Sequence, residues 1–481
     1  MADDDLYRIL IKGGVTSPGE LKDYIVLLES VGLEHVSFGS RQDLLFPVLS
    51  EVPRRSLEQF AQDKEELEGN RAVQNIVTSY VASDIFDATH WLKGSTYLYL
   101  LEEFDFKPRL KINITDPKQR LVPIFSGNLN FIASEHEDYW FLHILLPHWE
   151  HGEFYPVLVY TWDIVPVCRE IERCHREAQS IEDLFFLVQN HYDAKNKAFD
   201  KPLLLTQQTF PYYEGINRMG IDKFWLGLYW RNNRYDLDFL KEFCQFCLDN
   251  SIGKICLTPW KSFIVKGIPL SSKLALERLL GIRGINVRHS QLEMNWHIPI
   301  DDGEALKLKN YLVRSFDEND ISTYGLTFGI SADVGKRTHF TAVVVEKNPE
   351  SEMLTLGIQA PTYNVLYSKN FDPNTRQYIP YAQDVDRSAL PGLLMELSKT
   401  YFGQLGVYEA IKSARKKAPE NILHSVYQCQ HCLTIYDESV GDVFLGIEPG
   451  TLFDGLPETY ACPTCSAPKS GFNAVKINLQ P

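Results

Sequence analysis

Two pairs of cysteines near the end of the chain have the spacing of a metal site. Cys429 and Cys432 form one Cys-x-x-Cys pair, and Cys462 and Cys465 form a second pair with a proline after its first cysteine. Four thiolates on two short loops make a closed tetrahedral set of ligands, which suits either iron or zinc. The four cysteines are therefore the candidate metal ligands, and the residues around them must decide the metal.

The residues around the two pairs add a pattern of aromatic and turn residues. Its members are Tyr436, Pro449, Gly450, Thr451, Phe453, Tyr460 and Phe472. With the two cysteine pairs they make residues 424–475 closely similar to rubredoxin. This resemblance implies one iron ion between four cysteine sulfurs that shuttles single electrons, an aromatic core, and a turn between the cysteine loops. Because so short a domain buries little apolar area, its metal must contribute to folding.

Three positions depart from the rubredoxin pattern. Leu433 and Ser466 follow the cysteine pairs where rubredoxins usually have glycine, and Tyr460 stands where tryptophan is common. Glycine suits the first two sites because the backbone there tends to turn through positive φ, which strains a leucine. These departures bear on the reduction potential and on the N–H···S geometry rather than on the metal site itself. A structural zinc ribbon is the alternative, and the aromatic and proline pattern favours iron over zinc.

The composition sets the class of protein that carries this site. The chain has 481 residues, 44% of them hydrophobic, which is enough for about three domains with cores of their own. Its net charge of −15 argues against non-specific binding to nucleic acids or anionic membranes. It has no apolar run of about 18 residues and starts with acidic residues, so we expect a cytoplasmic protein without membrane insertion. The remaining cysteines lack framework spacing, which fits a reducing cytoplasm; they are Cys168, Cys174, Cys244, Cys247 and Cys256.

The order strand, helix, strand occurs twice ahead of the cysteine pairs. The apolar patterns predict strands at 6–12, 34–46, 224–230 and 254–267, and helices from Ser17 to Gly32 and from 236 to 250. Ser17, Pro18 and Glu20 give the first helix an N-cap and a first-turn signal. Two units in matching order predict a duplicated α+β body with pseudo-twofold symmetry.

These patterns divide the chain into five segments. We predict a first α+β lobe at 1–148, a helical connection at 149–210, a second α+β lobe at 211–402, a basic linker at 403–423 and the cysteine-bearing domain at 424–481. Residues 150–205 are expected to be largely helical, and residues 283–400 to be rich in strands. The linker contains the basic segment Lys412 to Lys417, which either is a solvated connector or docks the acidic last domain.

The duplicated body is distantly similar to the ferredoxin-like half-domains of sirohaem-dependent nitrite and sulfite reductases. Short motifs carry this resemblance at 39–42, 74–79, 107–111, 127–133 and 258–261. The fold class it implies is α+β, with duplicated reductase-like, ferredoxin-like half-domains followed by the small rubredoxin-like metal domain. In that family, basic residues at these motifs surround the sirohaem carboxylates and the anionic substrate, because both are negatively charged.

Four basic residues of the body match those family positions. The resemblance makes Arg41, Arg109, Lys111 and Lys261 the candidate contacts for an anion or a cofactor. The alternative is that each of them is a surface charge at the end of a strand. Both interpretations stay open.

The cysteines that hold the iron–sulfur cluster of those reductases are missing from the body. The family uses Cys-x5-Cys followed by Cys-x3-Cys; Cys168 and Cys174 match the first spacing, and nothing matches the second. Two cysteines six apart on a helix are expected on opposite faces, so we interpret them as incidental thiols. Cys244 and Cys247 are expected on one face of a buried helix. Without the cluster ligands, we do not expect six-electron reduction by the usual coupled cofactor.

The favoured function is transfer of one electron through an iron centre, so we expect an electron carrier rather than an enzyme. Its partners would be redox proteins, a reductase that donates electrons and an oxidoreductase that accepts them, and not nucleic acid. The body would bind a partner or an anion, and the resemblance implies a role in nitrite, nitrate or sulfite assimilation. Two alternatives stay open. One is an oxidoreductase that holds sirohaem or another tetrapyrrole, which the missing ligands disfavour; the other is a scaffold or assembly factor with a structural zinc domain.

Overall fold

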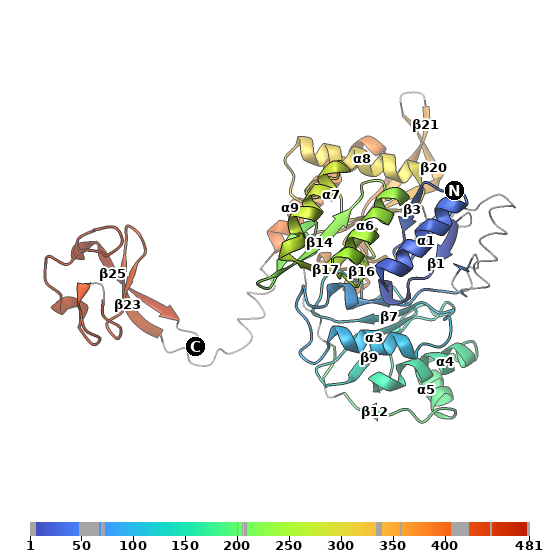
Figure 1. Ribbon diagram of the computed structural model, residues 1–481, viewed down its shortest axis with the longest axis horizontal. Coiled ribbons are helices and arrows are strands. Elements are labelled where there is room, and N and C mark those ends of the chain that lie inside the picture. The colour runs from blue at the N-terminus through green and yellow to red at the C-terminus, as the bar shows by residue number, and fades with distance from the viewer. Residues whose placement is uncertain are drawn as a thin grey trace. The chain divides into compact units, whose positions relative to one another are not determined.

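A computed structural model gives the arrangement of most of the chain. It describes residues 6–47, 67–68, 73–199, 201–203, 205, 209–332, 339–355, 358–405, 423–442 and 445–478. The chain divides into two compact units, Met1–Gly403 and Gln404–Pro481 (Figure 1). The finer division into five segments stays a prediction, and the basic segment 412–417 lies outside the described residues. Across the described ranges, none of the helices combines the length and the apolar character that a membrane span needs.

Two five-stranded sheets of the larger unit each belong mainly to one copy of the duplicated pattern. Their strand orders are β15-β3-β4-β1-β5 and β13-β14-β17-β16-β2. The strands are β1 (Leu6–Ile9), β2 (Val15–Thr16), β3 (His35–Phe38), β4 (Leu44–Pro47), β5 (Leu67–Glu68), β13 (Gly215–Met219), β14 (Lys223–Tyr229), β15 (Tyr235–Asp236), β16 (Ile255–Leu257) and β17 (Ser262–Pro269). The order strand, helix, strand therefore occurs twice, as the sequence predicts.

The two copies exchange short strands. β2 from the first copy pairs with β16 of the second, with Thr16 opposite Ile255, and β15 from the second copy pairs with β3 of the first. Helices α1 (Pro18–Ser30) and α6 (Leu237–Asp249) lie side by side (Figure 1). Both helices bury apolar side chains in one core that the two sheets share. The copies therefore stabilise each other, because each sheet includes a strand from the other copy.

Polar caps fix where the helices of the two copies begin. The Ser17 hydroxyl accepts a hydrogen bond from the Glu20 N–H, and the Glu20 carboxylate accepts one from the Ser17 N–H, which makes a capping box. Asp236 caps α6 by accepting a hydrogen bond from the Phe239 N–H (2.7 Å). Both predicted helices are confirmed. A further helix, α7 (Lys273–Ile282), packs in the same core.

The two long strands predicted at 34–46 and 254–267 are wrong. Each is a hairpin of two short strands, β3 with β4 and β16 with β17. The prediction failed because apolar residues lie on both sides of each turn, so the sequence pattern of one strand runs into that of the next. Pro259 has no N–H to donate to a β ladder, so it was an available signal for a break in the second strand.

The two hairpin turns have matching backbones. In the turns 39–43 and 258–262 the first N–H donates to the last carbonyl, at 2.8 and 2.9 Å. Gln42 and Lys261, the fourth residue of each turn, both have a φ of 59°. Lys261 therefore corresponds to Gln42 in the duplicated structure, and not to Arg41.

A seven-stranded sheet follows the first copy in the chain. Six strands have the order β12-β11-β9-β8-β7-β6, and β10 pairs with β9. The strands are β6 (Val77–Thr78), β7 (Ile112–Thr115), β8 (Leu129–Ala133), β9 (Tyr139–Ile144), β10 (Glu153–Phe154), β11 (Leu158–Tyr160) and β12 (Asn196–Lys197). Helices α3 (Gly94–Glu103), α4 (Ile164–Cys174) and α5 (Ile181–Gln189) share its larger core (Figure 1). The helical prediction for 150–205 missed β10, β11 and β12, because strands this short leave no clear period-two pattern.

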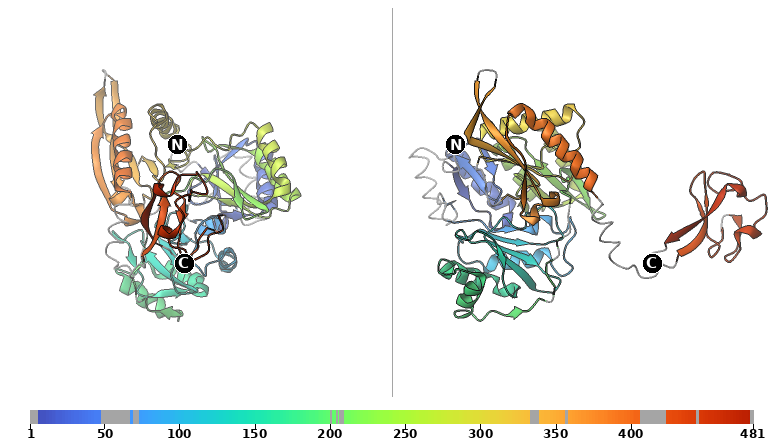
Figure 2. Two further views of the ribbon diagram at one scale, coloured as in Figure 1. Left: turned by 90° about the vertical axis from the view of Figure 1, so that its left-hand side faces the viewer. Right: turned by 180° about the vertical axis from the view of Figure 1, so that it is seen from behind.

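The last sheet of the larger unit has the order β18-β19-β20-β21-β22. Its strands are β18 (Trp296–His297), β19 (Phe328–Ser331), β20 (Val343–Thr355), β21 (Ile358–Ser368) and β22 (Tyr378–Val385). Helices α8 (Gly303–Glu318) and α9 (Leu390–Gln404) share its core, and the β20–β21 hairpin projects beyond the sheet (Figure 2). The prediction of a strand-rich segment at 283–400 is incomplete, since it missed α8 and the start of α9. Asp302, which caps α8, was an available signal.

The smaller unit is a three-stranded sheet that holds two loops. Its strand order is β24-β23-β25, with β23 (Leu423–Cys429), β24 (Ile435–Tyr436) and β25 (Phe472–Asn478). β25 pairs along the whole of β23, so that Phe472 lies opposite Cys429. The segment that follows the second cysteine pair therefore returns to the end of the strand that leads into the first pair.

The buried ring of His143 gives the larger unit a defined response to acid. His143 lies on β9, and the guanidinium of Arg376 contacts its Nε2. Burial first, and the charge of Arg376 second, lower the pKa of His143 to about 3. The unfolded chain binds a proton on this ring below about pH 6.5, and the folded chain does not. The free energy of unfolding should therefore fall by up to about 1.4 kcal/mol per pH unit between about pH 6.5 and 3.

Chemical denaturation at a series of pH values measures this slope. His143→Gln should flatten it between about pH 6 and 4, because the group that takes up the proton on unfolding is gone. His191→Gln serves as the matched control, since the His191 ring is exposed. Equal slopes in the wild type and in His143→Gln would contradict the prediction.

Candidate metal centre

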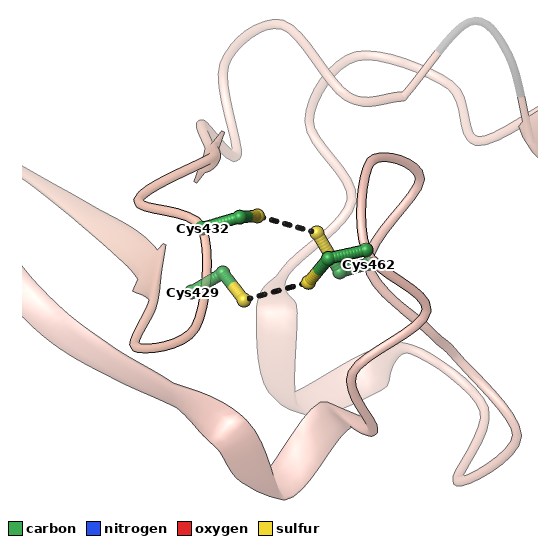
Figure 3. Close-up of side chains that lie close together, drawn as sticks. Cys429, Cys432 and Cys462 are labelled. Atoms are coloured by element: carbon green, nitrogen blue, oxygen red, sulfur yellow. Dashed lines mark hydrogen bonds between the residues drawn. The ribbon is translucent and has the colours of Figure 1, made fainter.

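Four cysteine sulfurs converge from two loops of the smaller unit. The Sγ atoms of Cys429, Cys432, Cys462 and Cys465 all lie within 4.8 Å of one another. The closest pairs of Sγ atoms join the two loops, at 3.6 Å between Cys429 and Cys465 and at 3.4 Å between Cys432 and Cys462 (Figure 3). Tetrahedral metal–sulfur bonds of about 2.3 Å need sulfurs about 3.8 Å apart, so these four fit one such ion. Among the residues with described positions, no other group of three or more His, Cys, Asp or Glu side chains is placed to hold a metal.

The two cysteine loops have the same backbone conformation. The residue after each pair donates its N–H to the carbonyl of the first cysteine, Leu433 to Cys429 and Ser466 to Cys462, both at 2.9 Å. Leu433 has a φ of 63° and Ser466 a φ of 60°. The prediction of positive φ at both positions is confirmed. Both residues therefore carry the strain that a side chain causes in the left-handed region.

Backbone amides and one hydroxyl lie against the sulfurs. The N–H groups of Thr434 and Ala467 donate to Cys432 and Cys465. The Thr434 hydroxyl oxygen lies 3.0 Å from Cys432 Sγ. This hydroxyl first, and the N–H of the same residue second, lower the pKa of Cys432 to about 6. The loop thus favours the thiolate form of Cys432, which is the form that binds a metal.

An aromatic core lies next to the cysteine loops. Its buried members are Tyr436, Phe453, Leu456, Tyr460 and Phe472, together with Cys429 and Cys462. The ring centroid of Phe453 is 5.4 Å from that of Phe472 and 5.6 Å from that of Tyr436. The Tyr436 hydroxyl donates to the carbonyl of Thr451 (2.9 Å), in the turn where Gly450 has a φ of 90°. The aromatic core and the turn that the sequence predicts are therefore confirmed.

The five cysteines of the larger unit are buried in its cores. They are Cys168, Cys174, Cys244, Cys247 and Cys256. Burial raises the pKa of each of these thiols, so all five favour the neutral form. Cys244 and Cys247 lie on the buried face of α6, as predicted. The expectation that Cys168 and Cys174 lie on opposite helix faces is wrong. Both are buried in one core, because residues six apart on a helix differ by only about 120°.

Arg41 is engaged inside the larger unit. Its guanidinium donates to Asn113 Oδ1 (2.6 Å) and to the carbonyls of Asn75 (2.6 Å) and Ile112 (2.9 Å). The side chain is buried, and burial lowers the pKa of Arg41 to about 9. The bonds to Asn113 and Ile112 join the turn 39–43 of the first sheet to β7 of the seven-stranded sheet, and the bond to Asn75 joins it to the segment before β6. The three bonds give Arg41 a structural task, whatever further contact it makes.

The other three candidate anion contacts have different environments. Lys261 is buried, and its Nζ donates to the carbonyl of Ile298. Arg109 is exposed, and its backbone N–H donates to the Glu172 carboxylate (2.6 Å). Lys111 is half-buried. A role in anion binding stays a prediction for all four basic residues.

An aromatic side chain stands in the second turn at the position of Arg41. Trp260 is buried, and its Nε1 donates to the carbonyl of Leu121 (2.7 Å). Its ring centroid lies 4.5 Å from that of Phe210 and 5.7 Å from that of Phe340. The second copy therefore places apolar rings where the first copy places a cation.

Thr434 and Thr464 are site residues that the cysteine pattern did not reveal. Their hydroxyl oxygens lie 2.9 Å apart and join the two cysteine loops beside Cys432. Thr464 is inside the second Cys-x-x-Cys motif and Thr434 is two residues after the first motif. The position of each threonine within two residues of a cysteine ligand in the sequence was the available signal. Their contact with each other arises only when the two loops fold together.

The smaller unit is similar in sequence to known proteins. The family model described as Rubredoxin matches residues 426–472. Rubredoxin 4 of Rhodococcus sp. (strain Q15) is 48% identical over 54 residues, which are 11% of this chain and 90% of the relative. Probable rubredoxin HupI of Bradyrhizobium diazoefficiens is 49% identical over 49 residues, which are 10% of this chain and 71% of the relative.

The larger unit is similar in structure to the NirA protein of Mycobacterium tuberculosis. The alignment has a TM-score of 0.64 and 14% sequence identity, and it covers 81% of this chain and 79% of that chain. At this identity the likeness shows a shared fold. The α+β, reductase-like architecture that the sequence predicts for the body is confirmed at that level.

The bonds of Arg41 predict a loss of stability when its guanidinium is removed. Arg41→Met keeps the aliphatic part of the side chain but leaves three buried oxygens without their donor. The free energy of unfolding of the larger unit should fall by about 3 kcal/mol or more. The exposed Arg109 is the matched control, and Arg109→Met should change stability by no more than about 0.5 kcal/mol. Urea denaturation of both variants measures the difference. Unchanged stability in Arg41→Met would show that the bonds contribute little.

The positive φ of Leu433 and Ser466 predicts that glycine stabilises the metal domain. Leu433→Gly and Ser466→Gly should each raise its free energy of unfolding by about 0.5–1 kcal/mol, because relief of left-handed strain exceeds the entropic cost of glycine. Denaturation of the iron-loaded chain, followed at the iron–thiolate absorbance, measures the change. His431→Gly is the control, since His431 is exposed and is not among the residues with positive φ. It should lower stability, and a loss in all three variants would contradict the strain.

Proposed function

This chain belongs to the rubredoxin family through its C-terminal domain, and from that premise we propose that it carries one electron at a time on a single iron ion held by Cys429, Cys432, Cys462 and Cys465. The iron, when bound, supplies the ferric–ferrous chemistry. The protein supplies four thiolates, the hydrogen bonds to them and a surface for redox partners. The observation that carries the proposal is the convergence of the four sulfurs within 4.8 Å.

The position of the sulfurs within the domain supports exchange of electrons with a partner. Cys432 and Cys465, the second cysteine of each pair, are half-exposed, whereas Cys429 and Cys462 are buried. A partner protein approaches the centre most closely at the two half-exposed sulfurs. Leu433, directly after Cys432, is 65% exposed, so the surface there has an apolar part that a partner would cover.

We further propose that the larger unit binds a redox partner or an anion in nitrite, nitrate or sulfite assimilation. The NirA-like fold supports this role. Arg41 and Lys261 already donate to oxygens of the protein itself, so the exposed Arg109 is the more accessible candidate contact for an anion. Placing carrier and body in one chain raises the concentration of the carrier near its partner. We place the protein in the cytoplasm, and the buried free thiols of the larger unit fit that reducing compartment.

A second candidate is a reductase that holds a tetrapyrrole in the larger unit and receives electrons from the iron centre. The likeness to the NirA protein over 81% of this chain favours it. The anionic carboxylates of a tetrapyrrole would need cationic side chains as partners in the larger unit. Of the candidate contacts, Arg109 is the one whose side chain is exposed. The visible spectrum separates this candidate from a simple carrier.

The iron assignment is tested on the full chain purified from iron-replete cells. We expect one iron per chain, iron–thiolate charge-transfer bands, and reversible loss of those bands when dithionite adds one electron. Cys432→Ser should remove most of the iron, because it replaces a sulfur ligand. Cys247→Ala, in the core of the larger unit, should keep the iron content of the wild type.

Other outcomes would replace the proposal. Zinc at one per chain without iron would contradict electron transfer and indicate a structural metal domain. Tetrapyrrole bands in addition to the iron–thiolate bands would establish the reductase instead of the simple carrier. Iron that dithionite does not reduce would contradict both the simple carrier and the reductase that receives electrons from the iron centre.

A further inference from the structure

Two threonine hydroxyls form a short chain beside one sulfur of the metal centre. Thr434 Oγ1 lies 3.0 Å from Cys432 Sγ and 2.9 Å from Thr464 Oγ1. Thr434 is half-buried and Thr464 is exposed. The two threonines belong to different cysteine loops, so this chain bridges the loops on the side of Cys432.

The hydroxyl of Thr434 has one proton and two acceptors within reach. In the structure its geometry suits donation to Thr464 Oγ1. A metal-bound Cys432 has no proton of its own, so its sulfur competes for the same donor. The orientation of one hydroxyl therefore depends on the charge that the sulfur carries.

We propose that Thr434 is a redox-linked hydrogen-bond donor that turns from Thr464 to the sulfur of Cys432 when the centre takes up an electron, and that it thereby raises the reduction potential. The proposal rests on the electron-transfer function proposed above. The added electron makes the sulfur ligands more negative and so better acceptors, while the Thr464 hydroxyl is unchanged. The iron, when bound, would accept the one electron from a reductase partner, and the proton stays on Thr434 Oγ1. Only hydrogen bonds change, and they favour the reduced state.

The second cysteine loop lacks such a hydroxyl. Its backbone bonding identifies Ala467 as the counterpart of Thr434: the Thr434 carbonyl accepts from the Cys429 N–H and the Ala467 carbonyl from the Cys462 N–H, both at 2.8 Å. A methyl group has no proton to donate to a sulfur. The loops are therefore matched in backbone but unequal in donors, and the chain offers its own position for a reciprocal variant.

The test is the midpoint potential of the iron in full-length variants, measured by spectroelectrochemical titration. Thr434→Val keeps the shape of the side chain and removes the donor. We expect the equilibrium between reduced and oxidised protein to shift about fivefold toward the oxidised form, because the variant loses a bond to a charged sulfur in the reduced state but only a weaker bond to a neutral hydroxyl in the oxidised state. This is a potential about 40 mV lower, at 59 mV per tenfold change for one electron. Thr434→Ser keeps the hydroxyl and should stay near the wild type.

Two more variants test the competition and the reciprocal position. Thr464→Val removes the competing acceptor, so the hydroxyl serves the sulfur in both oxidation states. The potential should then rise, by about a twofold shift in the equilibrium, opposite in sign to Thr434→Val. Ala467→Thr places a hydroxyl beside Cys465 and should also raise the potential.

An unchanged or higher potential in iron-loaded Thr434→Val would overturn the proposal. A shift of Thr464→Val in the same direction as Thr434→Val would overturn it as well, because loosening of the loops by either change has no reason to produce opposite signs. If Thr434→Val holds no iron, Ala467→Thr decides, and an unchanged potential there overturns the proposal. Wild-type iron that does not cycle would instead overturn the proposed function and this inference with it, which separates the two failures.

Discussion

Four thiolates within 4.8 Å of one another repel each other unless a cation lies between them, and the smaller unit depends on that balance. Its aromatic core has few members, so apolar burial alone contributes little to its stability. The same ion that cancels the charge also joins the two cysteine loops. Folding of this domain and its capacity to carry an electron therefore depend on one set of bonds.

The loops reach this arrangement through backbone geometry that their side chains do not favour. Leu433 and Ser466 both adopt positive φ, where glycine has no steric cost. This conformation lets the N–H of each residue donate to the carbonyl of the first cysteine of its loop, and this hydrogen bond closes the loop. With the backbones matched, the side chains are free to differ, and Thr434 and Ala467 give the two loops unequal donors near their sulfurs. Identical backbones with unequal hydroxyls allow tuning of one sulfur without disturbing the cage.

The larger unit shows a different use of buried charge. Arg41 occupies a position that the resemblance to reductases connects with anions, yet its guanidinium reaches from the turn 39–43 to three oxygens on or just before strands of the seven-stranded sheet. Burying a cation is costly unless its donors are used. Here Nη1 and Nη2 donate to carbonyl and amide oxygens of the fold, whereas Nε has no hydrogen-bond partner among the described residues. The exchange of β2 and β15 between the copies also stabilises the larger unit, because each of the two sheets includes a strand of the other copy. The larger unit therefore shares its fold with the NirA protein, while the hydrogen bonds of Arg41 stabilise the larger unit itself.

Cysteine spacing and the aromatic pattern determined the metal ligands, the positive φ at Leu433 and Ser466, and the core around Phe453, because these depend on residues close together in the chain. The cap and first-turn residues Ser17, Pro18 and Glu20 likewise determined where α1 begins. Only the tertiary structure decided that Arg41 reaches Asn113 and Ile112 on β7 and that Thr434 meets Thr464. Each of these depends on contacts between segments far apart in the sequence, and local periodicity carries no information about such contacts.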